Sequence, residues 1–125
     1  MYKRQGLPIT GEKATPLSFR SYKPFEKLEK GAFGTLVPST PAQEIIPLTL
    51  IIPLLGFTIE CSRIGYGGGY YDATIASLSK QNVIHTIGFA FECQKCDSLP
   101  IEDHDKQLDM IITECGIYRA KMAKA

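Results

Sequence analysis

The sequence predicts a single α/β domain built around a mostly parallel sheet, and three observations lead to this prediction. Residues 48–55 form a nearly continuous apolar run, a turn with four glycines follows at residues 65–69, and a second apolar run covers residues 83–91. A strand, a helix and a strand in this order are typical of α/β domains with parallel strands. The chain has 125 residues, so we assign residues 1–125 to one domain.

Charge balance and hydropathy exclude two classes of function. Lys and Arg number 14 against 13 Asp and Glu, so the chain lacks the basic surface that nucleic-acid binding requires. The basic tail at residues 119–124 is interpreted as a solvated helix face. The longest apolar run, residues 45–57, is interrupted by Pro47 and Pro53 and is shorter than the ~20 residues of a membrane-spanning helix. Residues 1–10 lack the apolar core of a signal peptide. We therefore expect a cytoplasmic protein that binds neither nucleic acid nor membrane.

The N-terminal third is predicted to be rich in short strands. Residues 7–10 and 17–22 have the composition of strands, and a turn at residues 11–13 separates them. Glycines and prolines within residues 31–41 then predict a loop. This part of the chain should therefore consist of strands and loops.

The apolar run at residues 48–55 (LTLIIPLL) predicts the first strand of the expected parallel sheet. The run is rich in isoleucine and precedes the glycines and the helix, as does a strand that is buried on both faces. Pro53 should lie at its end, because proline cannot donate a hydrogen bond to a central ladder.

One helix and two further strands are predicted after the glycines. Residues 70–80 predict an amphipathic helix, because their apolar side chains recur at the spacing of one helical face: Tyr71, Ile75 and Leu78. Residues 83–91 (VIHTIGFAF) predict the next strand. Residues 110–113 predict the last strand of the domain.

The four cysteines allow more than one interpretation. Cys93 and Cys96 form a C-x-x-C pair, which occurs both in zinc sites and in redox-active dithiols. A structural zinc site needs four ligands, usually from two such pairs, and neither Cys61 nor Cys115 has a second cysteine or a histidine at ligand spacing. Reduced thiols in a cytosolic protein are therefore the favoured interpretation.

The most informative stretch is the glycine-rich turn within RIGYGGGYYD, residues 63–72. Four glycines between a buried strand and a helix allow the backbone to approach a ligand closely. The helix start offers unpaired N–H groups, and Arg63 adds a forked donor, so the turn suits a phosphate. A Walker A loop is excluded because no lysine lies between Arg63 and Lys80, and the dinucleotide pattern G-x-G-x-x-G fails at Tyr70. The alternative is a turn that only tightens the packing of strand against helix.

Acidic residues near this turn are candidate metal ligands. Asp72 lies at the start of the predicted helix, where it is either a helix cap or a hard oxygen ligand for Mg²⁺ beside a phosphate. Residues 102–105 (EDHD) supply further carboxylates, and Asp109 follows at helical spacing. A histidine–aspartate pair also occurs in metal phosphohydrolases, but such sites need several histidines and only His85 remains elsewhere. A solvated turn is the other interpretation of this acidic segment.

Three long motifs follow one another along the chain: RIGYGGGYYD at 63–72, IGFAFECQ at 87–94 and LPIEDHDKQLDMIITE at 99–114. Weaker motifs are LPIT at 7–10, LSFR at 17–20 and GAFG at 31–34. Together they resemble the 5-formyltetrahydrofolate cyclo-ligase family, also called methenyltetrahydrofolate synthetase. The resemblance covers nearly the whole chain, and the order of the three long motifs is specific.

The resemblance implies a fold and a reaction. The fold is a three-layer α/β sandwich with a mostly parallel sheet, like that of ribose-5-phosphate isomerase and the CoA transferases. The reaction converts 5-formyltetrahydrofolate and ATP to 5,10-methenyltetrahydrofolate, ADP and phosphate. The γ-phosphoryl group is transferred to the formyl oxygen, a folate nitrogen closes the ring, and phosphate leaves. Phosphoryl transfer of this kind depends on positioning and charge stabilisation, with no nucleophilic side chain.

The resemblance also implies the ligands ATP, Mg²⁺ and a reduced folate. It assigns ATP binding to nine consecutive residues: Arg63, Ile64, Gly65, Tyr66, Gly67, Gly68, Gly69, Tyr70 and Tyr71. It assigns folate contacts to five of them: Tyr66, Gly67, Gly68, Gly69 and Tyr70. Mg²⁺ is expected on Asp72 and Asp105. Gln94 falls on a family position near the site, and the resemblance assigns it no role.

The chain also departs from the family pattern. Family members begin with a helix whose Lys and Arg contact ATP, followed by a folate-binding glutamate, whereas only residues 1–6 precede the LPIT strand here. Thr58 and Cys61 replace the Asp and Gly of the pattern F-D-x-x-G-x-R, and Val37 stands where glutamate is common. The alternative function is therefore a shortened, non-catalytic relative that keeps a phosphate-binding loop. A homo-oligomer is expected to cover the surface left by the shortened N-terminal part.

Overall fold

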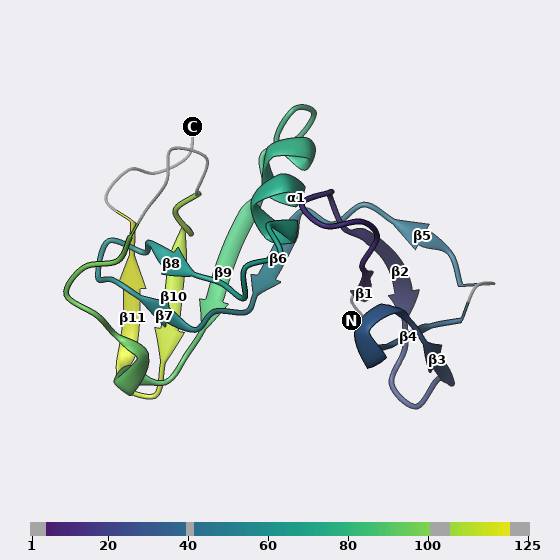
Figure 1. The fold of residues 1–125 in the computed structure, drawn as a ribbon, viewed down its shortest axis with the longest axis horizontal. Helices are drawn as coiled ribbons and strands as arrows, with labels where there is room; N and C mark the ends of the chain where they lie inside the picture. The colour runs from purple at the N-terminus through teal and green to yellow at the C-terminus, as the bar shows by residue number, and fades with distance from the viewer. Residues whose placement is uncertain (1–4, 40–41, 101–105, 121–125) are drawn as a thin grey trace, which may run out of the picture.

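The structure of this protein is a computed structural model, which describes residues 5–39, 42–100 and 106–120. Strands β1 to β5 gather at one end of the molecule and β6 to β11 at the other, with helix α1 between them (Figure 1). No helix of the described part is long and apolar enough to cross a membrane. The elements in chain order are β1 (Gln5–Ile9), β2 (Ser18–Tyr22), β3 (Leu28–Lys30), η1 (Ala32–Gly34), β4 (Leu36–Pro38), β5 (Glu44–Ile45), β6 (Thr49–Ile52), β7 (Gly56–Phe57), β8 (Arg63–Ile64), α1 (Tyr70–Leu78), β9 (His85–Phe89), η2 (Glu92–Gln94), β10 (Met110–Thr113) and β11 (Gly116–Arg119).

The N-terminal strands form two small antiparallel sheets. One has the order β1-β2-β5, and the other pairs β3 with β4. The two strands predicted at residues 7–10 and 17–22 are confirmed as β1 and β2. The loop predicted at 31–41 is partly wrong, because residues 36–38 pair with 28–30 as strand β4. Pro38 is tolerated there because it ends a strand at the edge of a two-stranded sheet.

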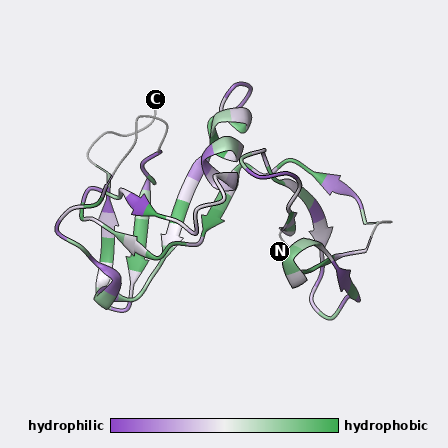
Figure 2. Cartoon of the chain, in the orientation of Figure 1, coloured by the Kyte–Doolittle hydropathy of each residue, from purple (hydrophilic) through white to green (hydrophobic). Residues whose placement is uncertain are grey.

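The main sheet has the strand order β11-β10-β9-β6. Strand β9 runs parallel to both β6 and β10, with Ile51 opposite Ile87 on one side and Met110 opposite the same residue on the other. The parallel arrangement predicted from the sequence is therefore confirmed for three strands. Figure 2 shows hydrophobic residues along β6 and β10 and hydrophilic ones on β3 and β5.

The last strand is antiparallel and was not predicted. Strand β11 pairs with β10 through a tight turn, so residues 110–113 are not the final strand. Arg119 lies at the end of this strand, and the interpretation of the basic tail as a helix face is wrong for this residue. Lys121 and Lys124 lie outside the described residues. Glycine at position 116, with φ of +149°, permits the reversal.

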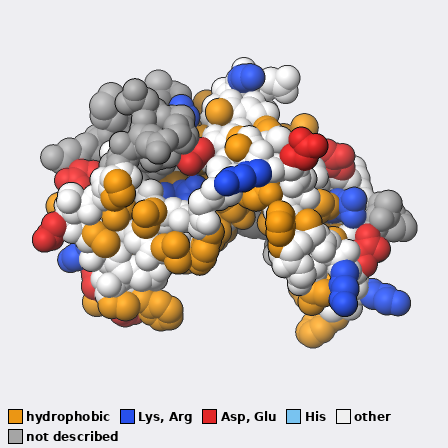
Figure 3. Space-filling view, viewed as in Figure 1, with side chains coloured by type: hydrophobic (Ala, Val, Ile, Leu, Met, Phe, Trp, Pro, Cys, Tyr) orange, Lys and Arg blue, Asp and Glu red, His pale blue; other side chains and the backbone are white. Residues whose placement is uncertain are grey.

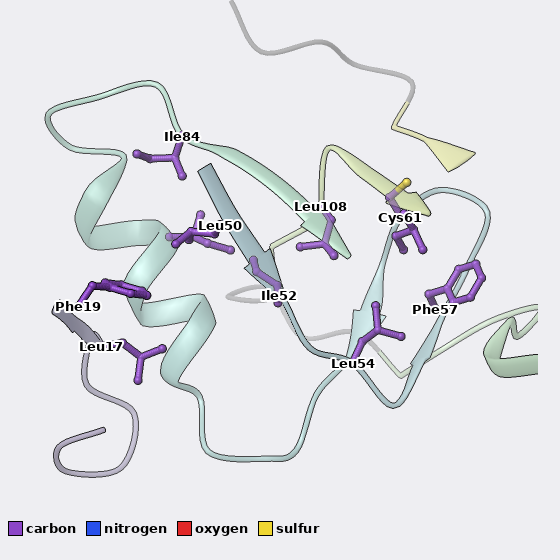
Figure 4. Packing of buried hydrophobic residues seen from close by; sticks show 11 residues of the cluster. Leu17, Phe19, Leu50, Ile52, Leu54, Phe57, Cys61, Ile84 and Leu108 are labelled. Atoms are coloured by element: carbon purple, nitrogen blue, oxygen red, sulfur yellow. The ribbon is translucent and has the colours of Figure 1, made fainter. Parts of the chain in front are cut away.

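The core lies between one face of the main sheet and helix α1. Leu50 and Ile52 of β6 are buried there (Figure 4), and Ile111 of β10 and Ile75 of the helix belong to the same buried cluster. The predicted helix is confirmed as residues 70–78. Its buried Thr74 also accepts a hydrogen bond from the backbone N–H of Leu17 at 2.8 Å, which connects the N-terminal strands to the core.

The prediction that residues 48–55 are buried on both faces is wrong. Burial alternates along β6: Leu50 and Ile52 are buried, whereas Thr49 and Ile51 are exposed. The physical reason is that, in the described part of the chain, helix α1 packs on one face of the sheet, whereas apolar side chains such as Ile51 on the other face stay exposed. Pro53 follows the end of β6, as predicted.

Candidate functional site at the glycine-rich loop

The glycine-rich loop, residues 65–69, connects β8 to α1. The sequence led us to expect a buried strand directly before the loop, and this expectation is wrong. The hairpin of β7 and β8 separates the loop from β6, and Ile64 of β8 is exposed. Gly67 has φ of +93° and Gly69 has φ of +70°, which are conformations that side-chain-bearing residues rarely adopt. A Cβ atom at Gly67 would meet nothing within 4 Å, so this stretch of backbone borders open space.

A pocket of about 830 Å³ opens beside this loop. All nine residues assigned to ATP binding from the resemblance line it, together with Asp72, Thr10, Thr35, Pro53 and Pro100. The segments that connect the N-terminal elements thus contribute to the wall, with Thr10 after β1 and Thr35 between η1 and β4. Figure 3 shows the molecule hollowed between its two ends, with hydrophobic side chains on both sides of the hollow. The sequence did not assign the last four residues named to a binding site, since they reach the pocket only through tertiary packing.

Arg63 lies under the loop with its side chain only 8% exposed. Its Nη1 donates to the carbonyl of Pro53 at 3.3 Å, and its Nη2 lies 3.8 Å from Oδ1 of Asp72. The guanidinium carbon also sits 5.9 Å from the centre of the Tyr71 ring, a cation–π contact. The buried Nε has no hydrogen-bond acceptor among the described residues.

The loop packs directly on this guanidinium. A Cβ atom at Gly65 would lie 2.4 Å from Nη1 of Arg63, so only glycine fits there without moving the arginine. Burial raises the pKa of the Tyr71 phenol, and the nearby Arg63 charge partly offsets the rise. Tyr71 is therefore a neutral platform for the arginine near neutral pH, and the local charge of the site comes from Arg63 and Asp72.

Asp72 is not the helix cap. Gly69 occupies the N-cap position, and Asp72 lies in the first turn of α1. Its Oδ1 accepts a hydrogen bond from the backbone N–H of Lys106 at 3.3 Å in addition to the contact with Arg63. The capping interpretation is therefore wrong. Asp105, the second expected metal ligand, lies outside the described residues, so the structure does not place the two carboxylates relative to each other.

The turn between β1 and β2 holds the loop from the other side. The N–H of Ala14 donates to the carbonyl of Gly68 at 2.8 Å, and the Tyr70 hydroxyl donates to the carbonyl of Gly11 at 3.2 Å. The C=O of Gly68 and the N–H of Gly69 belong to the same trans peptide and point in opposite directions. The hydrogen bond from Ala14 to the Gly68 carbonyl therefore directs the N–H of Gly69 away from Ala14. Ala14 adopts φ of +61°, which no sequence signal for alanine predicts.

The cysteines lie apart from this pocket wall. All four are free, with Cys61 buried and Cys93 and Cys115 exposed. Burial raises the pKa of the Cys61 thiol above its ordinary value. Within the described ranges, no group of three or more His, Cys, Asp or Glu side chains is arranged to hold a metal ion.

Comparison with known proteins identifies one family. The sequence profile of the 5-formyltetrahydrofolate cyclo-ligase family matches residues 2–114. The 5-formyltetrahydrofolate cyclo-ligase of Escherichia coli K12 is 30% identical over 121 residues, which cover 93% of this chain and 66% of that protein. The enzyme of the same name from Haemophilus influenzae is 33% identical over 96 residues, covering 74% and 51%. The chain thus spans between half and two thirds of these relatives.

Two solved structures are similar to the whole fold. The 5,10-methenyltetrahydrofolate synthetase of Aquifex aeolicus superposes with a TM-score of 0.71 and 27% identity, covering 98% of this chain and 61% of that one. The 5,10-methenyltetrahydrofolate synthetase of Mycoplasma pneumoniae superposes with a TM-score of 0.60 and 28% identity, covering 87% and 55%. The arrangement of both ends of the molecule is therefore shared with proteins of one family.

Proposed function

This chain belongs to the 5-formyltetrahydrofolate cyclo-ligase family, and from this premise we propose that its pocket binds the phosphates of ATP beside a reduced folate. The proposed reaction is the conversion of 5-formyltetrahydrofolate and ATP to 5,10-methenyltetrahydrofolate, ADP and phosphate. Residues 1–125 would act as one domain. The three-layer sandwich expected from the resemblance stays part of the proposal, since the described part of the chain has helix α1 on one face of the main sheet and exposed apolar side chains on the other.

The observation that carries the proposal is the buried Nε of Arg63, which has no acceptor among the described residues. A buried donor without a partner costs on the order of 1–3 kcal/mol, and more when it belongs to a charged group. Because Nε is closed to solvent in the ligand-free chain, an anion in the pocket would become its acceptor after a shift of the loop or of the guanidinium. The wall around Arg63 suits phosphate oxygens, since it consists of glycine backbone and of the first turn of α1, whose N–H groups point out of the helix.

The residues present also suit a magnesium ion beside the phosphates. Asp72 presents a carboxylate to the pocket, and hard oxygen ligands are those that Mg²⁺ prefers. Asp72 and Asp105 would hold the ion, which would supply charge neutralisation for phosphoryl transfer. In the absence of the ion, Arg63 and the N–H of Lys106 balance the charge of Asp72.

The chemistry requires positioning more than side-chain reactivity. The formyl oxygen takes the γ-phosphoryl group and ADP leaves, which makes the formyl carbon a better electrophile. A neighbouring folate nitrogen then bonds to this carbon and loses its proton, and the oxygen leaves as part of phosphate, which can take up that proton. Arg63 and the loop N–H groups would stabilise the charge on the transferring group, and the aromatic Tyr66, which is exposed at the pocket, offers a surface to the folate.

The direct test measures both steps with the 125-residue chain. Methenyltetrahydrofolate absorbance should rise when the chain is mixed with MgATP and 5-formyltetrahydrofolate, and calorimetry should detect MgATP binding at up to millimolar concentration, the weak end of specific binding. Binding without a rise in absorbance would instead support the alternative of a non-catalytic relative that keeps a phosphate-binding loop. Absence of both signals would overturn both proposals.

A further inference from the structure

We infer that Gln94 is a positioning residue for Arg63, which it controls through the backbone of residues 53–55. The inference rests on the proposed function, because its main measurement is nucleotide binding. Gln94 does not line the pocket, so any effect on a ligand must pass through other residues. The contacts on the two sides of residues 53–55 provide that route.

Gln94 uses both ends of its side-chain amide. Its Nε2 donates to the carbonyl oxygens of Leu54 and Leu55, each at 3.2 Å. Its Oε1 accepts from the N–H of Phe91 at 2.8 Å, which closes the short helix η2 and holds the amide in one orientation. An amide group is needed for this pattern, because it combines two N–H donors with an acceptor.

Arg63 is bonded to the same backbone segment. Its Nη1 donates to the carbonyl of Pro53, the residue immediately before the two carbonyls that Gln94 holds. The N–H of Leu55 donates to the carbonyl of Ile64 at 2.8 Å, so the segment is also fixed to the strand from which Arg63 projects. Three consecutive carbonyls therefore accept from two side chains, Gln94 outside the pocket and Arg63 inside it.

The backbone around Gln94 reinforces this connection. The N–H of Cys96, two residues after Gln94, donates to the carbonyl of Phe57 at 2.7 Å. Phe57 lies opposite Arg63 in the hairpin of β7 and β8. A Cβ atom at Gly56 would lie 3.4 Å from the Gln94 carbonyl, so η2 and the hairpin pack closely. Loss of the Gln94 donors should let residues 53–55 shift, and the Pro53 carbonyl would then no longer direct the guanidinium.

The test is a double-mutant cycle on MgATP affinity, with stability measured in parallel. Gln94→Met removes the amide and keeps the length of the side chain. It should weaken MgATP binding about tenfold in the wild-type chain and have little effect in an Arg63→Lys background, because coupled residues are not additive. An equal loss in both backgrounds would overturn the inference. If Gln94→Met does not fold, Gln94→Asn takes its place under the same criteria.

Tyr118→Phe is the matched control. The Tyr118 hydroxyl donates to the Glu92 carboxylate, so its loss loosens the same short helix without touching the donors of Gln94. MgATP affinity should stay within roughly twofold of wild type in this variant, as for an independent site. A loss as large as that of Gln94→Met would show that general loosening of η2 is responsible and would overturn a specific role of Gln94.

A measurement without ligand separates this inference from the proposed function. In the ligand-free chain, the Nε–H resonance of Arg63, assigned with the Arg63→Lys variant, should shift and exchange faster with water in Gln94→Met but not in Tyr118→Phe. An unchanged resonance in Gln94→Met would overturn the inference even if MgATP binds. If wild type fails to bind MgATP while the resonance responds, the proposed function fails and the positioning role stands.

Discussion

The two faces of the main sheet have similar apolar side chains and very different environments. On one face, Ile52 and Ile111 are buried against helix α1. On the other, Ile51, Phe89 and Ile117 are 52%, 57% and 54% exposed. The alternation of side chains along a strand places neighbours on opposite faces, but only a covering element buries them. The covered face also supports the site, because the helix that covers it begins at the glycine-rich loop.

The largest expected effect separates the two faces directly. Ile52→Ala should lower the free energy of unfolding by about 2–5 kcal/mol, since it leaves a cavity in the core. Ile51→Ala, its neighbour on the open face, should cost less than about 1 kcal/mol, because half of the side chain already contacts water. Denaturant unfolding of the two variants measures both values.

Equal losses in the two variants would show that the open face is covered in solution. Exposed apolar surface of this kind marks interaction sites or favours association. Light scattering would then be expected to show a homo-oligomer, as the sequence led us to expect. A compact monomer that does not bind a hydrophobic dye, together with a small loss for Ile51→Ala, would contradict that expectation.

The next prediction concerns the site on the covered side. Gly67→Ala and Gly34→Ala place the same methyl group at φ of +93° and +72°, and neither Cβ would meet an atom within 4 Å. Each should therefore cost a similar ~1–2 kcal/mol of backbone strain. Only Gly67→Ala should weaken MgATP binding, because its methyl group enters the pocket. Calorimetry on both variants checks this, and equal affinities would mean that the loop does not contact the nucleotide.

A smaller effect is expected from Asp72→Asn. Asp72 makes no cap hydrogen bond, so its contribution to the fold comes from the mostly buried contact with Arg63 at 3.8 Å and from the N–H of Lys106, a donor that the amide oxygen of Asn can still accept. Loss of a carboxylate ligand should reduce ATP affinity in the presence of Mg²⁺ much more than in EDTA. Titrations under the two conditions measure the difference, and an equal change in both would contradict a role in metal binding.

The smallest effect is expected at Cys61, which lies in the core next to the hairpin. Burial raises the pKa of its thiol in the folded chain, so the unfolded chain loses this proton at lower pH. The folded state therefore binds more protons, and stability should fall as pH rises above the ordinary thiol pKa. Cys61→Ala should reduce this slope in denaturant unfolding at alkaline pH. An unchanged slope would show that other groups cause it.

The sequence by itself determined the elements whose signals are local. The stripe of Tyr71, Ile75 and Leu78 predicted helix α1, and the glycines predicted the loop before it, because helical periodicity and positive φ depend on neighbouring residues. The motifs also identified the family. All nine residues of the expected ATP-binding set line one pocket, since they are contiguous in the chain, although their contacts with a ligand remain a prediction.

Tertiary structure alone decided which face of β6 is buried, because an apolar run does not indicate how many covering elements pack on it. It also decided the partners of the loop. Ala14 bonds to Gly68 and Gln94 to Leu54 across 54 and 40 residues, and Arg63 bonds to Pro53 across 10. In each pair the acceptor is a backbone carbonyl, which carries no residue-specific signal. Every residue except proline offers the same backbone donor and acceptor, so only the folded chain selects which of them meet.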